Sequence, residues 1–417
     1  MSGQSQSEIE QPHTLSLGEI DPAGSRHMGR RSAVLVAGDL VVVGTASGTV
    51  TAIETESLGT QATLNERWSS TAGNAAIVSS TAFADGITVG ERSPSGAVRL
   101  HDRDTGEVRW RYATADDVGT PQSETRFALP FVVAVATDED RLYVASRRYE
   151  RSGDNREFTS VVYSFDADGT IEWQHRTDGS PISLAARDDR IAVGYNRCPG
   201  DHQQGLIVLD SETGDVEWSW DPGTDGQRRV GDVSLLDDSV VVTSHGDYRG
   251  YCLADGTVCW RADLALPRTV NGETLYAYPN HTHATDSGIV FITGNTYPEA
   301  GRETDSLHPN EHTIFGYSTD GEREWSDSIG GFTNAFDADG SFLAVPCAQN
   351  FRTRNPATHA LRIYDTEDGH QYSVPTQGVT TAAAISDGVI AAVEEPITYH
   401  DEEKQHGQYR MHTGRWE

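Results

Sequence analysis

The sequence predicts an all-β protein built from repeated units, and three observations support this. Apolar residues come in short runs that are rich in β-branched side chains and bounded by Asp-Gly pairs, a pattern typical of buried strands. No stretch keeps a helical period over three turns. The runs also recur in one order: an acidic-Gly turn, a strand, a loop, a second strand, another acidic-Gly turn and a Trp.

The number of repeats predicts the architecture. Copies occupy residues 37–55, 84–110, 138–173, 188–218, 236–260, 286–325, 339–372 and 386–416. The aromatic residues that close them are Trp68, Trp110, Trp173, Trp218, Trp260, Trp325, Tyr372 and Trp416. Their spacing runs from 42 residues (Trp68 to Trp110) to 65 residues (Trp260 to Trp325), which fits one four-stranded blade per repeat. We therefore predict an eight-bladed β-propeller.

The two ends of the chain indicate how the ring closes. Trp416 is followed by Glu417 alone, so the last repeat lacks its outer strand. Residues 14–20 form a spare strand at the other end, and an unpaired sheet edge is a liability that β proteins avoid. We expect the N- and C-terminal strands to pair, residues 1–12 to be a disordered tail, and 13–417 to be a single, monomeric propeller domain.

The first repeat follows two arginines, Arg30 and Arg31, an arrangement that also occurs in twin-arginine export signals. Asp39 interrupts the apolar run, however, and the stretch aligns with the other repeats. Cleavage there would remove strands of the first blade. We expect the segment to stay in the fold and the protein to be cytoplasmic, since no other segment resembles a signal peptide or a membrane span.

The composition is strongly acidic. The 417 residues include 63 Asp and Glu against 32 Lys and Arg, a net charge of -31, and Lys404 is the single lysine. At about 1 M salt the Debye length falls to about 3 Å, so such a surface stays hydrated without strong self-repulsion. We interpret the bias as halophilic adaptation, as in a haloarchaeon. The same charge argues against nucleic acid and anionic membrane surfaces as partners.

Two copies of the repeat also resemble a known family. The segments DRDTGEVRW (102–110) and DSETGDVEW (210–218) are similar to the tryptophan-docking repeat of the quinoprotein-alcohol-dehydrogenase-like propellers. Pyrroloquinoline-quinone enzymes and the outer-membrane assembly lipoprotein B share that fold, and the resemblance covers about 33–417. It implies that the repeat tryptophans dock neighbouring blades, namely Trp68, Trp110, Trp173, Trp218, Trp260, Trp325 and Trp416.

The enzymatic branch of that family fits less well. Its quinone site uses a disulfide between adjacent cysteines, whereas Cys198, Cys252, Cys259 and Cys347 are all separated in this sequence. No GxSxG, HExxH or P-loop motif is present either. We predict no catalytic residues, no cofactor and no metal. A quinone- or metal-dependent dehydrogenase is kept as an alternative.

Insertions favour a binding role for one face of the ring. The insertions lie at 147–159, 197–204, 296–312, 349–359 and 396–407, each between the second and third strands of a blade, so they emerge together. They contain the arginines and aromatics that interfaces favour, namely Arg147, Arg148, Tyr149, Arg151, Phe351, Arg352 and Arg354. We predict a non-catalytic interaction scaffold that binds a protein partner through this decorated face.

A second location for binding is the central funnel of the ring. The polar residues expected on the inner strands are Ser183, Asp232, His281, His283 and Thr333. They provide an alternative, a site for a small ligand or a sugar. The histidine pair has donor atoms suited to zinc or copper, but two histidines that alternate on a strand are also typical of a solvated polar column, and we predict no metal there.

Overall fold

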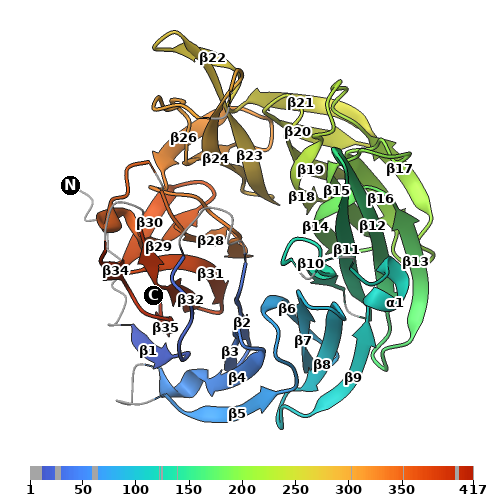
Figure 1. Cartoon of the computed structure of the whole chain (residues 1–417), viewed down its shortest axis with the longest axis vertical. Helices are drawn as coiled ribbons and strands as arrows, with labels where there is room; N and C mark the ends of the chain where they lie inside the picture. Colours follow the sequence, from blue (N-terminus) through green and yellow to red (C-terminus); the bar gives the residue numbers. More distant parts are fainter. Residues whose placement is uncertain are drawn as a thin grey trace.

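The computed structural model describes residues 12–23, 30–58, 64–121, 123, 125–138, 140–301, 303–350, 352–399 and 403–416. Within these residues, eight sheets of antiparallel strands stand around a central axis like the blades of a propeller (Figure 1). Each sheet runs from an inner strand beside the axis to an outer strand at the rim. The predicted all-β, eight-bladed propeller is therefore confirmed.

The blades follow one another in chain order, and within each blade the strands run from the axis outward. Blade 1 is β2 (Ala33–Ala37), β3 (Leu40–Gly44), β4 (Thr49–Glu54) and β5 (Glu66–Thr71), and blade 2 is β6 (Ile77–Phe83), β7 (Gly86–Glu91), β8 (Ala97–Asp102) and β9 (Val108–Ala113). Blade 3 is β10 (Phe131–Thr137), β11 (Leu142–Ser152), β12 (Asn155–Phe165) and β13 (Ile171–Thr177), and blade 4 is β14 (Ser180–Arg187), β15 (Arg190–Arg197), β16 (Leu206–Asp210) and β17 (Val216–Trp220).

Blade 5 is β18 (Val230–Leu236), β19 (Ser239–Ser244), β20 (Arg249–Ala254) and β21 (Thr257–Asp263). Blade 6 is β23 (Glu273–Thr285), β24 (Gly288–Pro298), β25 (Thr313–Tyr317) and β26 (Arg323–Ser328), with the short β22 (Arg268–Val270) added to β23. Blade 7 is β27 (Asp337–Asp339), β28 (Phe342–Pro346), β29 (Ala360–Asp365) and β30 (Gly369–Pro375). Blade 8 is β31 (Val379–Ser386), β32 (Val389–Glu395), β35 (Arg410–Arg415) and β1 (His13–Ser16). The remaining elements are the helix α1 (Ala115–Val118), 3-10 turns at Thr55–Ser57 and Pro356–Thr358, and the hairpin of β33 (Ile397–Thr398) and β34 (Gln405–His406).

The two ends of the chain close the ring, as the sequence predicts. Strand β1 pairs antiparallel with β35, with Leu15 opposite Met411. The backbone N–H of Leu17 then donates to the carbonyl of Tyr409 at 3.0 Å. The paired strand is shorter than the predicted 14–20. Residues 1–11, the core of the expected tail, lie outside the described residues.

The docking of one blade on the next is clearest at Trp173. Its indole Nε1–H donates to the carbonyl of Ser211 at 2.9 Å, and its ring lies against Gly214 in the outer turn of blade 4. The equivalent bonds are Trp68 to Arg103 O, Trp110 to Ala167 O, Trp260 to Thr319 O and Trp325 to Thr366 O. Trp218 packs on Gly256, and Trp416 meets Phe342 edge-on at 4.4 Å.

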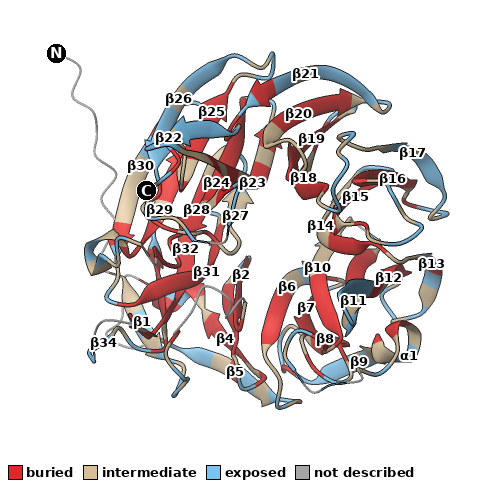
Figure 2. Ribbon diagram, turned by 45° about the horizontal axis from the view of Figure 1, so that its top comes forward, coloured by how far each residue is buried: buried red, intermediate tan, exposed pale blue. Residues whose placement is uncertain are grey.

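Burial follows the position of a strand within its blade (Figure 2). Strand β7 is buried throughout, because its blade covers it on both sides and neighbouring blades pack against its faces. Strand β9 at the rim is mostly exposed or half-buried. This explains why the middle strands are continuous apolar runs whereas the outer strands alternate. No described helix is long and apolar enough to cross a membrane.

One predicted loop is in fact regular structure. The segment 147–159 continues β11 and β12 as a long hairpin, with Ser152 opposite Asn155 at its tip. The predicted insertion therefore lies between the second and third strands as expected, but it extends both strands, because extra length between two strands does not distinguish a loop from longer strands. The hairpin still emerges on the side that carries the loops between second and third strands and the connections between blades, which we call the loop face.

Candidate functional site

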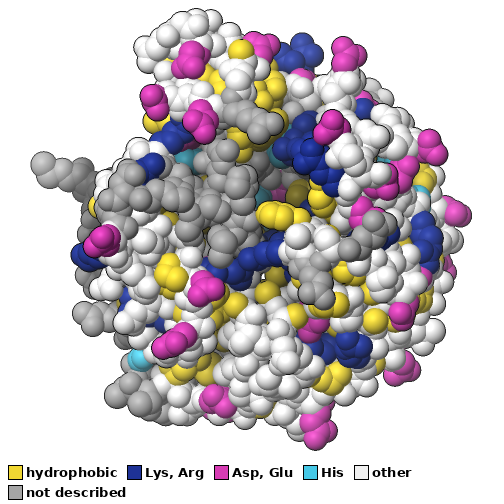
Figure 3. Space-filling model, viewed as in Figure 1, with side chains coloured by type: hydrophobic (Ala, Val, Ile, Leu, Met, Phe, Trp, Pro, Cys, Tyr) yellow, Lys and Arg dark blue, Asp and Glu magenta, His cyan; other side chains and the backbone are white. Residues whose placement is uncertain are grey.

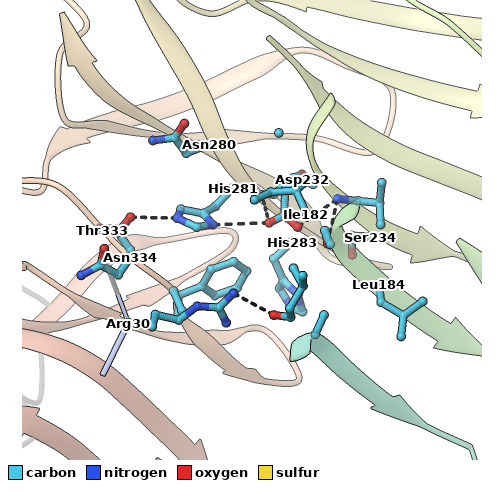
Figure 4. A pocket seen from close by; sticks show the side chains of 18 of the residues that line it. Arg30, Ile182, Leu184, Asp232, Ser234, Asn280, His281, His283, Thr333 and Asn334 are labelled. Carbon is cyan, nitrogen blue, oxygen red and sulfur yellow. Dashed lines mark hydrogen bonds and ion pairs between the residues drawn. The ribbon is translucent and has the colours of Figure 1, made fainter. Parts of the chain in front are cut away.

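A cavity of about 490 Å³ occupies the centre of the ring (Figure 4). The inner strands and the ends of several loop-face segments form its walls. All five polar residues predicted for the funnel line it, namely Ser183, Asp232, His281, His283 and Thr333. The structure therefore brings this predicted set together, although the residues come from blades 4, 5 and 6 and from the connection that leads into blade 7.

Several of these polar side chains hold the inner strands together. The carboxylate of Asp232 accepts the backbone N–H of Thr282 in the next blade at 3.0 Å. The Ser234 hydroxyl accepts the backbone N–H of Ala284 at 3.1 Å in the same way. At these positions the inner strands have no further strand on the axis side, so such side chains satisfy backbone groups that would otherwise lack partners.

The two histidines make similar inter-blade contacts. The Nε2–H of His281 donates to the carbonyl of Thr333 at 2.9 Å, while its Nδ1 lies 3.5 Å from a carboxylate oxygen of Asp232. The Nε2–H of His283 donates to the carbonyl of Gly340 at 3.1 Å, and burial lowers the pKa of this imidazole. Within the described residues, no three His, Cys, Asp or Glu side chains gather in a way that could hold a metal ion.

Arginines gather on the loop face around the mouth of the cavity (Figure 3). We call this set the arginine cluster: Arg30, Arg92, Arg126, Arg147, Arg156, Arg197 and Arg228. Within the described residues, none of its members forms an ion pair within 4.0 Å, although many other arginines of the protein do. The arginine cluster is therefore a region of concentrated positive charge on a protein whose net charge is -31.

The ring of Phe131 is the centre of the inner part of this cluster. The guanidinium carbon of Arg92 lies 3.7 Å from the ring centroid, and those of Arg147 and Arg30 lie 5.6 and 5.8 Å from it. Phe131 is placed there because its backbone pairs with Arg147 in blade 3 and bridges to Arg92 of blade 2. Cation–π attraction offsets part of the cost of bringing these charges together.

Burial and mutual repulsion lower the pKa values of the arginines around Phe131. Burial lowers the pKa of Arg92, and the charges of Arg126, Arg147 and Arg30 lower it further. Burial and the charge of Arg30 lower the pKa of Arg147 in the same way. A guanidinium stays protonated at neutral pH, so an anion can relieve this repulsion where loss of a proton cannot.

The cavity continues outward as a groove along blade 3. A small cavity lined by Arg92, Phe127, Phe131, Arg147 and Tyr149 adjoins it. A larger one of about 810 Å³ follows, and Phe127, Arg147 and Tyr149 line this cavity as well. The ring of Phe127 is 59% exposed at this place. We call the path from the central cavity to the larger one the arginine groove.

The residues predicted for partner binding lie at different places. Arg147 and Tyr149 line the arginine groove, and Arg151 is 63% exposed beside Asp154. Arg148 donates to the carbonyl of Val118 at 2.6 Å, so it holds the α1 connection in place.

In the predicted insertion 349–359, Arg352 donates to the carbonyls of Thr296 and Ser306, both at 3.0 Å. Its guanidinium therefore fastens the loop that follows β24. Arg354 is half-buried in a left-handed backbone conformation (φ 49°). Phe351 lies outside the described residues.

Most of the arginine cluster was missed from the sequence, although a signal existed. Arg92 and Arg147 occupy equivalent register positions in adjacent blades, two residues after Gly90 and Ala145, although β7 ends before Arg92 whereas β11 continues beyond Arg147. Arg197 ends the second strand of the next blade. Aligning the repeats by strand register rather than by insertions would have placed these three on one arc of the loop face.

The docking tryptophans, the eight-bladed ring and a match to a family model together make the protein a β-propeller of the PQQ-repeat type. The chain belongs to the family described as outer membrane protein assembly factor BamB, whose model matches residues 60–220 and 94–372. No curated protein matches the chain.

Solved structures of low sequence identity share the fold. BamB from Moraxella catarrhalis is 15% identical, with 96% of this chain and 97% of that chain covered and a TM-score of 0.54. The quinohemoprotein alcohol dehydrogenase from Comamonas testosteroni is 11% identical, with 98% and 76% covered and a TM-score of 0.57. The computationally designed Ika8 protein is 12% identical, with 93% and 98% covered and a TM-score of 0.58.

Proposed function

We propose that the protein is a non-catalytic scaffold that binds an acidic protein partner through the arginine groove on its loop face. The observation that carries this proposal is the arginine cluster, whose seven members form no ion pair within 4.0 Å with any carboxylate in the described part of a chain of net charge -31. Clustered guanidiniums bind carboxylates through paired hydrogen bonds. The family name, outer membrane protein assembly factor, is consistent with a role in protein assembly.

Short-range contacts have to supply most of the affinity if the protein works in molar salt, as its composition suggests. Salt at such concentrations screens the electrostatic attraction between the arginine cluster and an approaching acidic partner beyond about 3 Å. The groove offers suitable contacts, because Phe127 is exposed and Tyr149 packs on Phe158 with 5.3 Å between ring centroids. Aromatic and arginine side chains are the groups that dominate binding energy at protein interfaces.

The experiment that tests the scaffold is affinity capture from native lysate in molar KCl, followed by mass spectrometry. The groove variant carries Arg92→Glu, Arg147→Glu and Arg197→Glu. A matched control changes three exposed arginines of outer strands at the rim, Arg109 in β9, Arg261 in β21 and Arg323 in β26, to Glu and therefore has the same net charge. We expect the wild type and the control to capture the same partner and the groove variant to lose it.

Two results would count against the scaffold. If the groove variant keeps the partner, the arginine groove is not the binding surface. If both variants lose it equally, net charge alone decides binding. Circular dichroism of all three proteins, which should superimpose, checks that the substitutions leave the fold intact.

We also propose that the twin-arginine stretch serves the fold and that the protein acts in the cytoplasm. The guanidinium of Arg31 forms a buried ion pair with Glu395 of blade 8, and Arg30 lines the central cavity. Strand β2, which follows, is the inner strand of blade 1. Intact mass of the native protein tests this proposal, and a mature chain that begins after about residue 45 would contradict it.

A second candidate function is small-ligand binding in the funnel. It is favoured by the size of the central cavity, about 490 Å³, which lies in the range of small-molecule sites.

A further inference from the structure

We propose that the central cavity binds a small organic dianion, a dicarboxylate or an organic phosphate, whose negative charge is held by Arg30, Arg92 and Arg147 beside Phe131. This site goes beyond the scaffold role, and it rests on the second candidate function, small-ligand binding in the funnel, whose ligand class it names. The two proposals can fail separately, because a protein partner can use the outer groove without any ligand in the cavity.

The charge of the cavity wall favours a dianion. Among its described lining residues are three arginines, Arg30, Arg92 and Arg147, and one carboxylate, Asp232. With the three lining histidines, His245, His281 and His283, counted as neutral, the formal charge of these residues is +3 - 1 = +2. Charges in a partly closed site of low dielectric interact strongly, so a ligand of charge -2 balances the wall, whereas a neutral sugar leaves the repulsion unrelieved.

Hydrogen-bond donors remain available for such a ligand. Arg92 makes no side-chain hydrogen bond within the described part of the chain and is held by the Phe131 ring alone. Arg30 donates one bond to the carbonyl of Val133 at 2.8 Å, and Arg147 donates to the Ser180 hydroxyl. Each guanidinium carries five N–H donors, so the three together can hold two carboxylate or phosphate groups in the bidentate geometry that these anions prefer.

The rest of the wall suits an organic body rather than an inorganic ion. Phe131, Ile182, Leu184, Phe332 and Phe336 supply apolar surface around the cavity. In Figure 4, Arg30 lies on one side of the cavity and the Asp232–His281 pair on the other. Because the carboxylate of Asp232 repels anions, the anionic groups face the arginines, and an uncharged or apolar end extends toward Asp232.

Isothermal titration calorimetry of the full chain tests this site at constant ionic strength in about 2 M KCl, where nonspecific charge attraction is screened. The probes are benzene-1,3-dicarboxylate, succinate, phenyl phosphate, inorganic phosphate and the monoanion benzoate. We expect an aromatic dianion to bind at least about 10-fold more tightly than benzoate, the usual size of one charge-assisted hydrogen bond. Comparison of the dicarboxylate with phenyl phosphate shows which anionic group the site takes.

Matched variants locate the site. Arg92→Gln should weaken binding of the preferred dianion by about 10-fold or more, whereas Arg156→Gln should leave it unchanged, because Arg156 lines the outer groove but not the central cavity. Arg147→Gln is a second cavity variant. Arg92→Gln should also melt at the same or a higher temperature than the wild type without ligand, since it removes a buried charge that is repelled by other arginines and has no ion-pair partner among the described residues.

Three results would overturn the small-anion site. They are the absence of binding heat for every dianion, equal affinity in the Arg92→Gln and Arg156→Gln proteins, and a marked loss of stability in Arg92→Gln, which would show that Arg92 holds the fold together. If acidic peptides bind and small dianions do not, the cavity proposal fails while the scaffold proposal stands.

Discussion

The carboxylate of Glu394 gives the protein a defined sensitivity to acid. It is fully buried in β32 and accepts hydrogen bonds from the His412 imidazole and the Arg410 guanidinium of β35. The backbone N–H groups of Gly378 and Gln408 donate to the same carboxylate at 2.9 and 3.1 Å. Glu394 thus ties β32 to β35, to the residues just before β35 and to the entry of β31, where the ring closes.

The magnitude follows from the pKa of this group. Burial alone would raise the pKa of Glu394, but the hydrogen bonds from His412, Gly378 and Gln408 and the charge of Arg410 lower it from 4.5 to about 2. A shift of that size corresponds to about 3 kcal/mol of stability. Because the folded-state pKa is the lower one, this contribution is complete above about pH 4.5 and is lost as the pH falls toward 2.

The variant Glu394→Gln removes the charge and keeps the shape. At neutral pH we expect it to be less stable than the wild type by about 3 kcal/mol, the usual cost of breaking a buried pair. For a chain of this length that is a fall of about 3–4 °C in the melting temperature, given about 2 cal/mol/K of unfolding entropy per residue. Differential scanning calorimetry between pH 7 and 2 at constant salt measures both values.

The difference between wild type and variant isolates Glu394 from the many other carboxylates that titrate in acid. It should be constant above about pH 4.5 and vanish near pH 2. Glu107→Gln, which alters an exposed carboxylate in a turn of blade 2, serves as the control and should match the wild type throughout. A gap that stays constant down to pH 2, or an equal loss in the control, would refute this role for Glu394.

Three further predictions concern the ring and its surface. Gly214→Ala should lower the free energy of unfolding in urea more than Gly223→Ala does. The two glycines have nearly equal φ values, 73° and 74°. A Cβ atom at 214 would lie 2.6 Å from the Trp173 ring, whereas a Cβ atom at 223 would have no heavy atom within 4 Å among the described residues. Equal losses would show that the docked indole does not matter. Deleting residues 1–20 should lower the melting temperature by several degrees because β35 loses its outer partner β1, while deleting 1–10 should have little effect. Equal melting of all three chains in molar KCl would show that the terminal pairing is dispensable. Dilution from about 3 M to about 0.1 M KCl should lower the melting temperature, since screening of the net charge of -31 is lost, and a melting temperature independent of salt would contradict halophilic adaptation.

The fold was predictable because each blade repeats the same local pattern. Asp-Gly turns, apolar runs and a closing Trp fix where each strand begins and ends, and the spare strand before residue 20 indicated closure with β35. The exact extent of strands was less predictable. The hairpin of β11 and β12 continues through the expected loop 147–159 because extra residues between two strands can extend their pairing.

The site was predictable only in part. The funnel residues, such as Asp232 and His281, follow from strand register and do line one cavity. The roles of individual arginines depend on packing that no local pattern encodes. Arg352 is engaged by carbonyls of a loop some fifty residues away in sequence, whereas Arg92 is left without a described carboxylate because its neighbours are Phe131 and other arginines.

The central claim is that the arginine cluster is the binding surface, and protection from chemical modification tests it most directly. The protein is treated with phenylglyoxal, an arginine-specific reagent, with and without the partner recovered by capture, and each arginine is assigned by peptide mass mapping. We expect the partner to protect Arg92, Arg147 and Arg197 from modification and to leave the modification of Arg261 and Arg323 on the rim unchanged. Protection of the rim arginines with undiminished modification of the cluster would contradict this claim.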